Sequence, residues 1–120
     1  MSHIDILWTE HLSQTLASIE WIVMIDFWAA WCGPCRMLAP VLHQVVEQYA
    51  GKVHLVKVDI DADENQPLAI QYAISSIPRV LFFMKWEKID DFVGVQWLDA
   101  VKSIIEKHLP KDSTNTVSVQ

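Results

Sequence analysis

The stretch DFWAAWCGPCRMLAP, residues 26–40, contains both cysteines of the chain and the change from a strand pattern to a helix pattern. It starts within a continuous run of branched and aromatic residues, IVMIDFW at positions 22–28, which predicts a strand buried on both faces. After Gly33 and Pro34, apolar residues recur at helical spacing as far as Tyr49. The two cysteines therefore lie where a buried strand passes into a long helix, which is one unit of an α/β fold.

The rest of the chain repeats this alternation. Apolar patterns predict strands at residues 3–8, 22–28, 53–60, 80–84 and 88–94. They predict helices at 9–19, with Thr9 as the N-cap, and at 33–50, 64–72 and 97–108, the last with Trp97 on its core face. The order β-α-β-α-β-α-β-β-α predicts a central mixed five-stranded sheet with four helices on both faces. We expect one domain, residues 1–110, and a polar tail, 111–120, that frays.

The composition argues against several classes of function. Nine Lys and Arg against fifteen Asp and Glu give a net charge of −6, whereas a nucleic-acid-binding protein needs clustered basic residues to neutralise phosphates. No apolar stretch approaches the roughly 18 residues of a membrane-spanning helix, and the N-terminus lacks a signal-peptide pattern. We therefore expect a cytoplasmic protein without membrane or nucleic-acid partners.

The C-x-x-C spacing of Cys32 and Cys35 is compatible with a structural disulfide, half of a metal site or a redox pair. A disulfide across two residues closes a very small loop and stabilises a fold poorly, and permanent disulfides are rare in the cytosol. A zinc site needs about four ligands. The chain has no second C-x-x-C, and its five histidines are scattered without ligand spacing. Reversible thiol–disulfide exchange fits the pair best.

The position of Cys32 at a helix start has a chemical consequence. Unpaired backbone N–H groups and the positive end of the helix dipole favour the thiolate, which is the nucleophilic form of cysteine. We therefore expect Cys32 to attack a target disulfide and Cys35, one turn later, to resolve the mixed disulfide.

Asp26 lies in the middle of the apolar strand, where burying a carboxylate is costly unless the group is paired or used. We interpret it as the group that takes and returns the proton of Cys35. Lys57, in the strand LVKVDI, is the expected cationic partner. A structural Asp that hydrogen-bonds the backbone is the alternative.

The stretch around the cysteines, together with VDID at 58–61, SIP at 76–78 and FVG at 92–94, resembles the thioredoxin family over about residues 4–109. The resemblance implies that Cys32 is the nucleophile, Cys35 the resolving thiol, and Asp26 and Lys57 the buried acid and its partner. It implies a cis peptide bond before Pro78. It also implies an apolar docking surface for substrate proteins made of Trp31, Gly33, Pro34, Ile77, Pro78, Val93, Gly94 and Val95.

The same resemblance implies a protein-disulfide reductase that works through a redox-active Cys32–Cys35 disulfide and has no bound cofactor. Its partners would be disulfide-containing proteins and an NADPH-dependent thioredoxin reductase. Gly33 and Pro34 are typical of reducing members, which disfavours a dithiol oxidase or isomerase. A binding or assembly subunit with incidental redox activity stays open as an alternative.

The chain departs from the family pattern at two places. Arg79 stands where thioredoxins generally have Thr; it could steer acidic substrates or lower the thiol pKa, but we expect it to point to solvent. Lys85 and Trp86 replace the usual Asn-Gly turn, and we expect a different hairpin geometry there. Trp86 is also one of four tryptophans, with Trp8, Trp21 and Trp97, that the family does not explain; they serve either packing or a partner surface.

Overall fold

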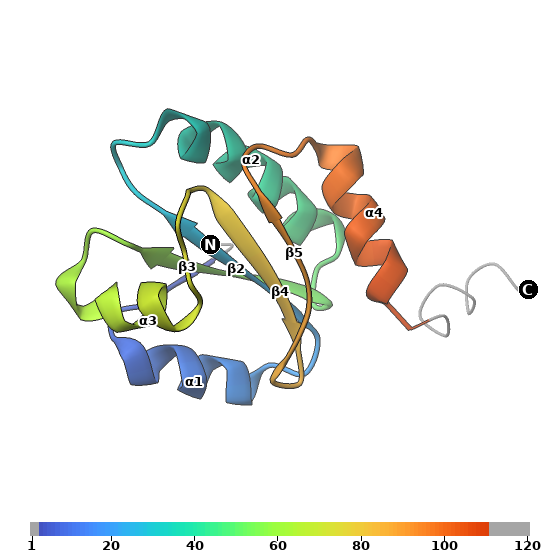
Figure 1. Cartoon of the computed structure of the whole chain (residues 1–120). Coiled ribbons are helices and arrows are strands. Elements are labelled where there is room, and N and C mark those ends of the chain that lie inside the picture. The colour runs from blue at the N-terminus through green and yellow to red at the C-terminus, as the bar shows by residue number, and fades with distance from the viewer. Residues whose placement is uncertain (1–2, 111–120) are drawn as a thin grey trace, which may run out of the picture.

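The computed structural model describes residues 3–110 of the chain. Figure 1 shows one sheet with helices on both sides. The strands are β1 (Ile4–Asp5), β2 (Ile22–Trp28), β3 (Val53–Asp59), β4 (Arg79–Met84) and β5 (Glu87–Val93). The helices are α1 (Thr9–Ser18), α2 (Gly33–Gln48), α3 (Gln66–Gln71) and α4 (Leu98–His108), with a 3₁₀ turn, η1 (Asp63–Asn65), before α3. The predicted tail at 111–120 lies outside the described residues.

The strand order in the sheet is β1-β3-β2-β4-β5. β1, β3 and β2 are parallel, whereas β4 is antiparallel to β2 and β5 is antiparallel to β4. This mixed five-stranded sheet with four α-helices confirms the predicted fold class. The register places Asp26 of the central strand β2 between Lys57 of β3 and Val80 of β4.

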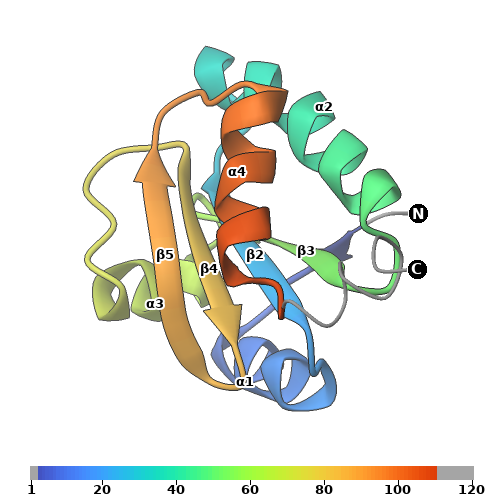
Figure 2. The same cartoon turned by 90° about the vertical axis from the view of Figure 1, so that its right-hand side faces the viewer.

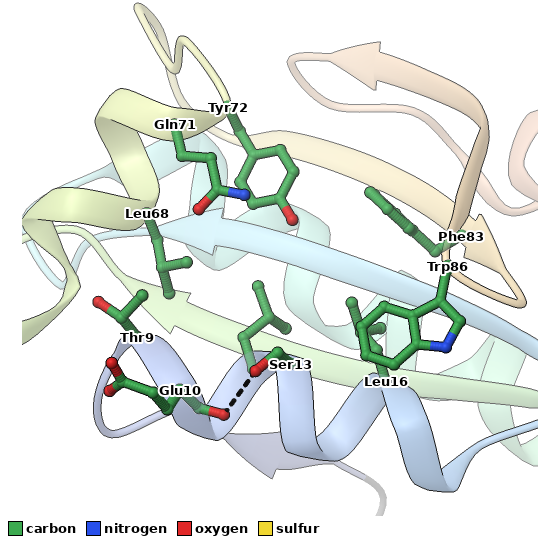
Figure 3. A pocket seen from close by; sticks show the side chains of 10 residues that line it. Thr9, Glu10, Ser13, Leu16, Leu68, Gln71, Tyr72, Phe83 and Trp86 are labelled. Atoms are coloured by element: carbon green, nitrogen blue, oxygen red, sulfur yellow. Dashed lines mark hydrogen bonds between the residues drawn. The ribbon is translucent and has the colours of Figure 1, made fainter.

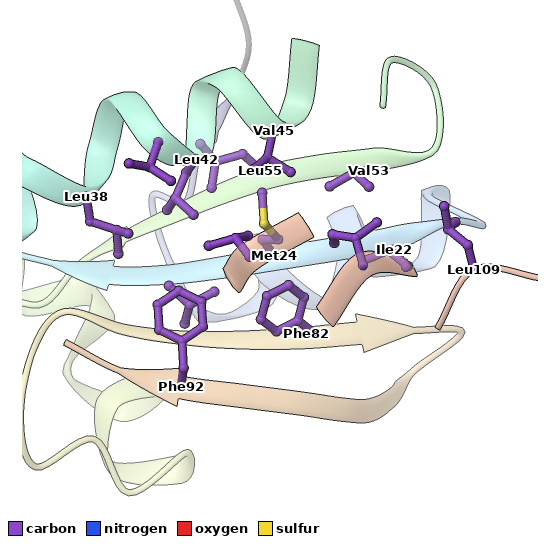
Figure 4. Close-up of a cluster of buried hydrophobic side chains, with 14 residues drawn as sticks. Ile22, Met24, Leu38, Leu42, Val45, Val53, Leu55, Phe82, Phe92 and Leu109 are labelled. Carbon is purple, nitrogen blue, oxygen red and sulfur yellow. The ribbon is translucent and has the colours of Figure 1, made fainter. Parts of the chain in front are cut away.

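Two hydrophobic cores fill the two faces of the sheet, and β2 contributes to both because its side chains alternate between the faces. Met24 faces α2 and α4, where it joins Leu42 and Phe82 in the cluster of Figure 4. Ile25 faces the other side and joins the cluster beneath α1 and α3. Figures 1 and 2 show the same division, with α2 and α4 on one side of the sheet and α1 and α3 on the other. The prediction that this strand is buried on both faces is confirmed.

The N-terminal segment differs from the prediction. The strand is limited to Ile4–Asp5, and Thr9 lies inside α1 rather than capping it. The N-cap residue is Trp8, whose side chain makes no capping hydrogen bond. Instead, the Leu7 N–H donates to Nδ1 of His11 at 3.0 Å, and the Trp8 indole stacks on the His11 ring. A side chain from within the helix thus satisfies a backbone donor just before the helix start.

The hairpin between β4 and β5 shows that the expectation of a different turn geometry was wrong. Met84 pairs with Glu87 across a two-residue loop, and both Lys85 and Trp86 have positive φ, at 51° and 73°. Positive φ at both central residues is the geometry that Asn-Gly turns normally supply, because it matches the twist of the flanking strands. Pairing of the two strands therefore imposes the turn on residues that are ill suited to it.

The prediction for Trp97 was also wrong. The last helix begins at Leu98, and Trp97 is its N-cap in an extended conformation with 61% of its surface exposed. Because it precedes the first helical residue, it does not follow the periodicity of the core face. Trp21, by contrast, packs against the core beneath α2 and α4. Within residues 3–110, no helix combines the length and the hydropathy that crossing a bilayer requires.

Candidate active site

Cys32 and Cys35 form a disulfide at the junction of β2 and α2, with their Cα atoms 5.3 Å apart. Cys32 is the N-cap of α2, and its Sγ accepts a hydrogen bond from the Cys35 N–H at 3.1 Å. Each cysteine is only 4% exposed. A backbone donor aimed at Sγ and the positive end of a 16-residue helix both favour negative charge on Cys32 once the disulfide is reduced. The helix start and the backbone donor expected beside Cys32 are thus present.

The loop before the disulfide is fixed by three hydrogen bonds. The Cys32 N–H donates to the carbonyl of Ala29 at 3.1 Å, and the Arg36 N–H donates to the carbonyl of Cys32 at 3.2 Å. The Arg36 guanidinium reaches back to the carbonyl of Ala30 at 2.7 Å. These contacts hold the segment that carries Trp31 against the first turn of α2.

Asp26 lies on the face of the sheet that α2 covers, because it follows Met24 by two residues in β2. Cys35 lies on the buried side of α2, above the same face. Asp26 is 1% exposed, and its Oδ2 lies 4.0 Å from Nζ of Lys57. Burial raises the pKa of Asp26 from 3.8 to about 7, and the Lys57 ammonium only partly opposes this effect. The site thus combines a buried disulfide with an acid whose pKa burial raises to about 7.

The Ile77–Pro78 pair connects the surroundings of the disulfide with the end of β5. The Ile77–Pro78 bond is cis, and the carbonyl of Pro78 accepts a hydrogen bond from the Gly94 N–H at 2.8 Å. Ile77 packs against the cluster that contains both cysteines. Gly94 takes a positive φ of 82°, which a glycine adopts without steric cost. Two loops distant in sequence therefore meet beside the disulfide.

A pocket of about 260 Å³ adjoins the disulfide. It brings together Trp31 and Ile77, two of the predicted docking residues, and Trp31 is 66% exposed. The sequence analysis missed the other residues that line it, which are Ile60, Ile74, Ser75 and Ser76. An available signal was their position, since Ile60 directly follows a parallel strand and the others directly precede the Ile-Pro pair.

The remaining predicted docking residues do not line this pocket. Pro34 is exposed and Gly33 half-buried on the first turn of α2, and Val93 is exposed on the edge strand β5. Val95 is half-buried in the connection to α4. Lys57 does not line the pocket beside the disulfide. It lines a separate one of about 380 Å³, on the β1 and β3 side of the buried acid.

The expectation that Arg79 points to solvent was wrong. Its side chain is 19% exposed, and Nη2 lies 2.5 Å from Oδ2 of Asp91 on β5. Lys88 also contacts Asp91, at 2.8 Å. Hydrogen bonds from Lys88 and Arg79 hold the pKa of Asp91 below its ordinary value. The guanidinium is therefore neutralised within the hairpin, because Asp91 lies on the neighbouring strand within its reach.

A pocket of about 430 Å³ lies between α1, α3 and the β4–β5 hairpin. Figure 3 shows the Trp86 indole at one end of it, with Tyr72 at the end of α3, Phe83 on β4 and Leu16 on α1. No residue of the predicted site lines this pocket, so we place the redox site at the smaller pocket that adjoins the disulfide. Among residues 3–110, no group of three or more His, Cys, Asp or Glu side chains is arranged to hold a metal ion.

Comparison with known proteins gives one consistent result. The family model described as Thioredoxin matches residues 4–107. Thioredoxin 1 of Nostoc sp. is 47% identical over 87 residues, which cover 72% of this chain and 79% of that protein. The thioredoxin of Staphylococcus saprophyticus is 43% identical over 86 residues, covering 72% and 81%. Among solved structures, a mutant thioredoxin from Halobacterium salinarum superimposes with a TM-score of 0.79 at 34% identity, covering 91% of this chain and 95% of that one.

Proposed function

Because the chain belongs to the thioredoxin family and is a thiol–disulfide oxidoreductase that reduces protein disulfides, we propose distinct roles for its two cysteines. Cys32 is the attacking thiol and Cys35 is the resolving thiol. The observation that carries this assignment is the hydrogen bond from the Cys35 N–H to Sγ of Cys32 at the start of α2. It makes Cys32 the sulfur on which negative charge is stabilised.

The reaction proceeds in two exchange steps. The Cys32 thiolate attacks one sulfur of a target disulfide, which forms a mixed disulfide and releases the first target cysteine as a thiolate. Cys35 then loses its proton and attacks the Cys32 sulfur, which releases the second target cysteine. Two electrons have passed to the target, and the protein is left with the Cys32–Cys35 disulfide seen in the structure.

Asp26 manages the proton of the second step. Its pKa of about 7 means that it is divided between its two protonation states near neutral pH, which suits a group that must both accept and return a proton. Lys57 keeps the ionised form accessible despite the burial of the carboxyl.

The substrate segment docks on the apolar surface beside the disulfide. Trp31, Ile77 and Val93 supply its exposed or half-buried apolar area, and Gly33, Pro34, Pro78, Gly94 and Val95 shape the backbone around it. Pro78 holds its loop so that the backbone of Ile77 can pair with an extended substrate strand. The pocket with Ile60 and Ile74 receives an apolar substrate side chain.

Membership of the thioredoxin family supports our proposal for the physiological setting. Disulfide-containing proteins are the substrates, and an NADPH-dependent thioredoxin reductase returns the disulfide to the dithiol. The protein works in the cytoplasm as one domain of residues 1–110, without a tightly bound cofactor and without nucleic-acid or membrane partners.

The assignment is tested by reduction of insulin disulfides in the presence of dithiothreitol. The wild type should accelerate the reaction, Cys32→Ser should abolish the acceleration, and Cys35→Ser should accumulate a mixed disulfide with the substrate. Trapping by Cys32→Ser instead of Cys35→Ser would reverse the two roles. An inactive wild type would contradict the function itself.

A further inference from the structure

We propose that Trp28 is a positioning residue, whose indole face holds the Lys57 ammonium beside the Asp26 carboxylate. This inference rests on the proposed role of Asp26 in the exchange reaction. Nζ of Lys57 lies 4.7 Å from the centre of the Trp28 ring and 4.0 Å from Oδ2 of Asp26. The ammonium is therefore held between a ring face and a carboxylate.

The backbone arrangement explains why these three groups meet. Asp26 and Trp28 are separated by one residue in β2, so their side chains point to the same face of the sheet. Lys57 is the register partner of Asp26 on the parallel strand β3, and Asp59 is that of Trp28. The lysine side chain needs only to lean along the strand to cover the ring.

Other carboxylates near Lys57 could also attract its ammonium group, so attraction to Asp26 alone does not explain where the ammonium lies. The carboxylates of Asp5, Asp59 and Glu64 line the same pocket as Lys57 and Trp28. On the α2 side, Cys35 is buried and disulfide-bonded, so it carries no charge in the oxidised protein. His43 has a lowered pKa, first because of burial and then because of the nearby charges of His3 and Lys57. A long, flexible ammonium side chain that was free to turn would reach the more hydrated carboxylates at a lower cost in desolvation.

The ring face restricts this freedom. Lys57 is 11% exposed, and the attraction between an ammonium and the face of a Trp ring strengthens when the cation is removed from water. The indole Nε1 is buried and makes no hydrogen bond to another residue in the described range. The face of the ring, rather than its N–H group, is thus the part of Trp28 that acts on Lys57. Trp28 also packs against the cluster of buried residues that contains both cysteines, and this contact restricts the movement of the ring.

The test is the titration of Asp26 followed by NMR of 13C-labelled Asp carboxyl groups in the oxidised protein, in which neither cysteine titrates. Trp28→Leu should move the midpoint of the Asp26 titration upward by about 0.5 to 1 pH unit, because the loss of a cation–π contact lets Lys57 move away. Trp28→Phe, which keeps a ring face and lacks the N–H, should restore most of the wild-type midpoint. The same substitutions in a Lys57→Met background should leave the midpoint unchanged.

The direction of the shift separates positioning from packing. A cavity left by Trp28→Leu would admit water to Asp26 and move the midpoint downward, which would overturn the proposal. An equal shift in the Lys57→Met background, or a Phe variant that shifts as far as the Leu variant, would also overturn it. If the Leu variant does not fold, the Phe and Tyr variants in both backgrounds provide the same comparison: each should lie within about 0.5 pH unit of the wild type when Lys57 is present. Because the titration needs no turnover, its result is independent of whether the protein reduces insulin.

Discussion

Asp26 and Lys57 are register partners on adjacent strands, yet Oδ2 and Nζ approach each other only to 4.0 Å. At this separation, the cation does not offset the loss of hydration around a carboxyl that is 1% exposed, and the pKa of Asp26 remains at about 7. The protein thus keeps in its core an acid whose ionised form is unfavourable.

The stability of the protein should therefore fall as the pH rises from about 4 to about 7. In this window, native Asp26 still binds a proton that the unfolded chain, with a pKa of 3.8, has released. Asp26→Asn removes this linkage, so its stability relative to the wild type should increase by up to about 4 kcal/mol between acid and alkaline conditions. Guanidinium unfolding of both proteins across this range measures the difference. Wild-type and variant curves that stay parallel would contradict the raised pKa.

The same variant should slow the resolution of the mixed disulfide. Without the Asp26 carboxylate, Cys35 must lose its proton to solvent, and the rate of resolution near neutral pH should fall by up to about a hundredfold. The attack by Cys32 should change less, because its thiolate is favoured by the start of α2. Stopped-flow measurement of the two steps tests this, and the resolution step of the variant should also lack the inflection near pH 7 that Asp26 gives the wild type. Equal slowing of both steps would count against a specific role in the proton transfer.

Trp86 should be replaceable by glycine with a gain in stability. Its φ of 73° lies in the left-handed region, which costs a non-glycine residue about 1 kcal/mol and costs glycine little. Trp86→Ala is the matched control, since it also removes the indole but keeps the backbone penalty. We expect the Gly variant to exceed the Ala variant by about 1 kcal/mol in thermal or denaturant unfolding. An Ala variant as stable as the Gly variant would show that the turn carries no such cost.

Arg79→Met should leave substrate charge preference unchanged. The guanidinium is engaged by Asp91, so it contributes little field at the disulfide, and the cost in stability should be below about 1 kcal/mol for this half-buried ion pair. Comparing the rates for acidic and basic disulfide peptides, with the wild type and the variant, measures the preference. A selective loss of activity toward acidic peptides would show that Arg79 reaches the substrate after all.

The parts of the fold that could be predicted are those that the local spacing of apolar residues specifies. The apolar run IVMIDFW predicted β2 with the bounds that the structure shows. A strand that is buried on both faces forms a nearly continuous apolar run, so its ends are visible in the sequence. Trp97 was misplaced because periodicity does not reveal on which side of a helix start a residue falls. The hairpin at Lys85 and Trp86 was misjudged because strand pairing overrode the preference of the turn residues.

The chemistry of this protein could be inferred from the sequence, because it depends on two cysteines at a strand–helix junction, an acid in the preceding apolar strand and the family motifs around them. These are local features, so their chemical roles can be inferred without knowledge of the three-dimensional structure. The surroundings of these residues, by contrast, depend on the tertiary structure. It set the distance between Asp26 and Lys57, turned Arg79 onto Asp91, placed Trp28 against Lys57, and brought Ile60 and Ile74 to the pocket beside the disulfide. These relationships join residues from different strands and loops, so they depend on register and burial, which no local pattern encodes.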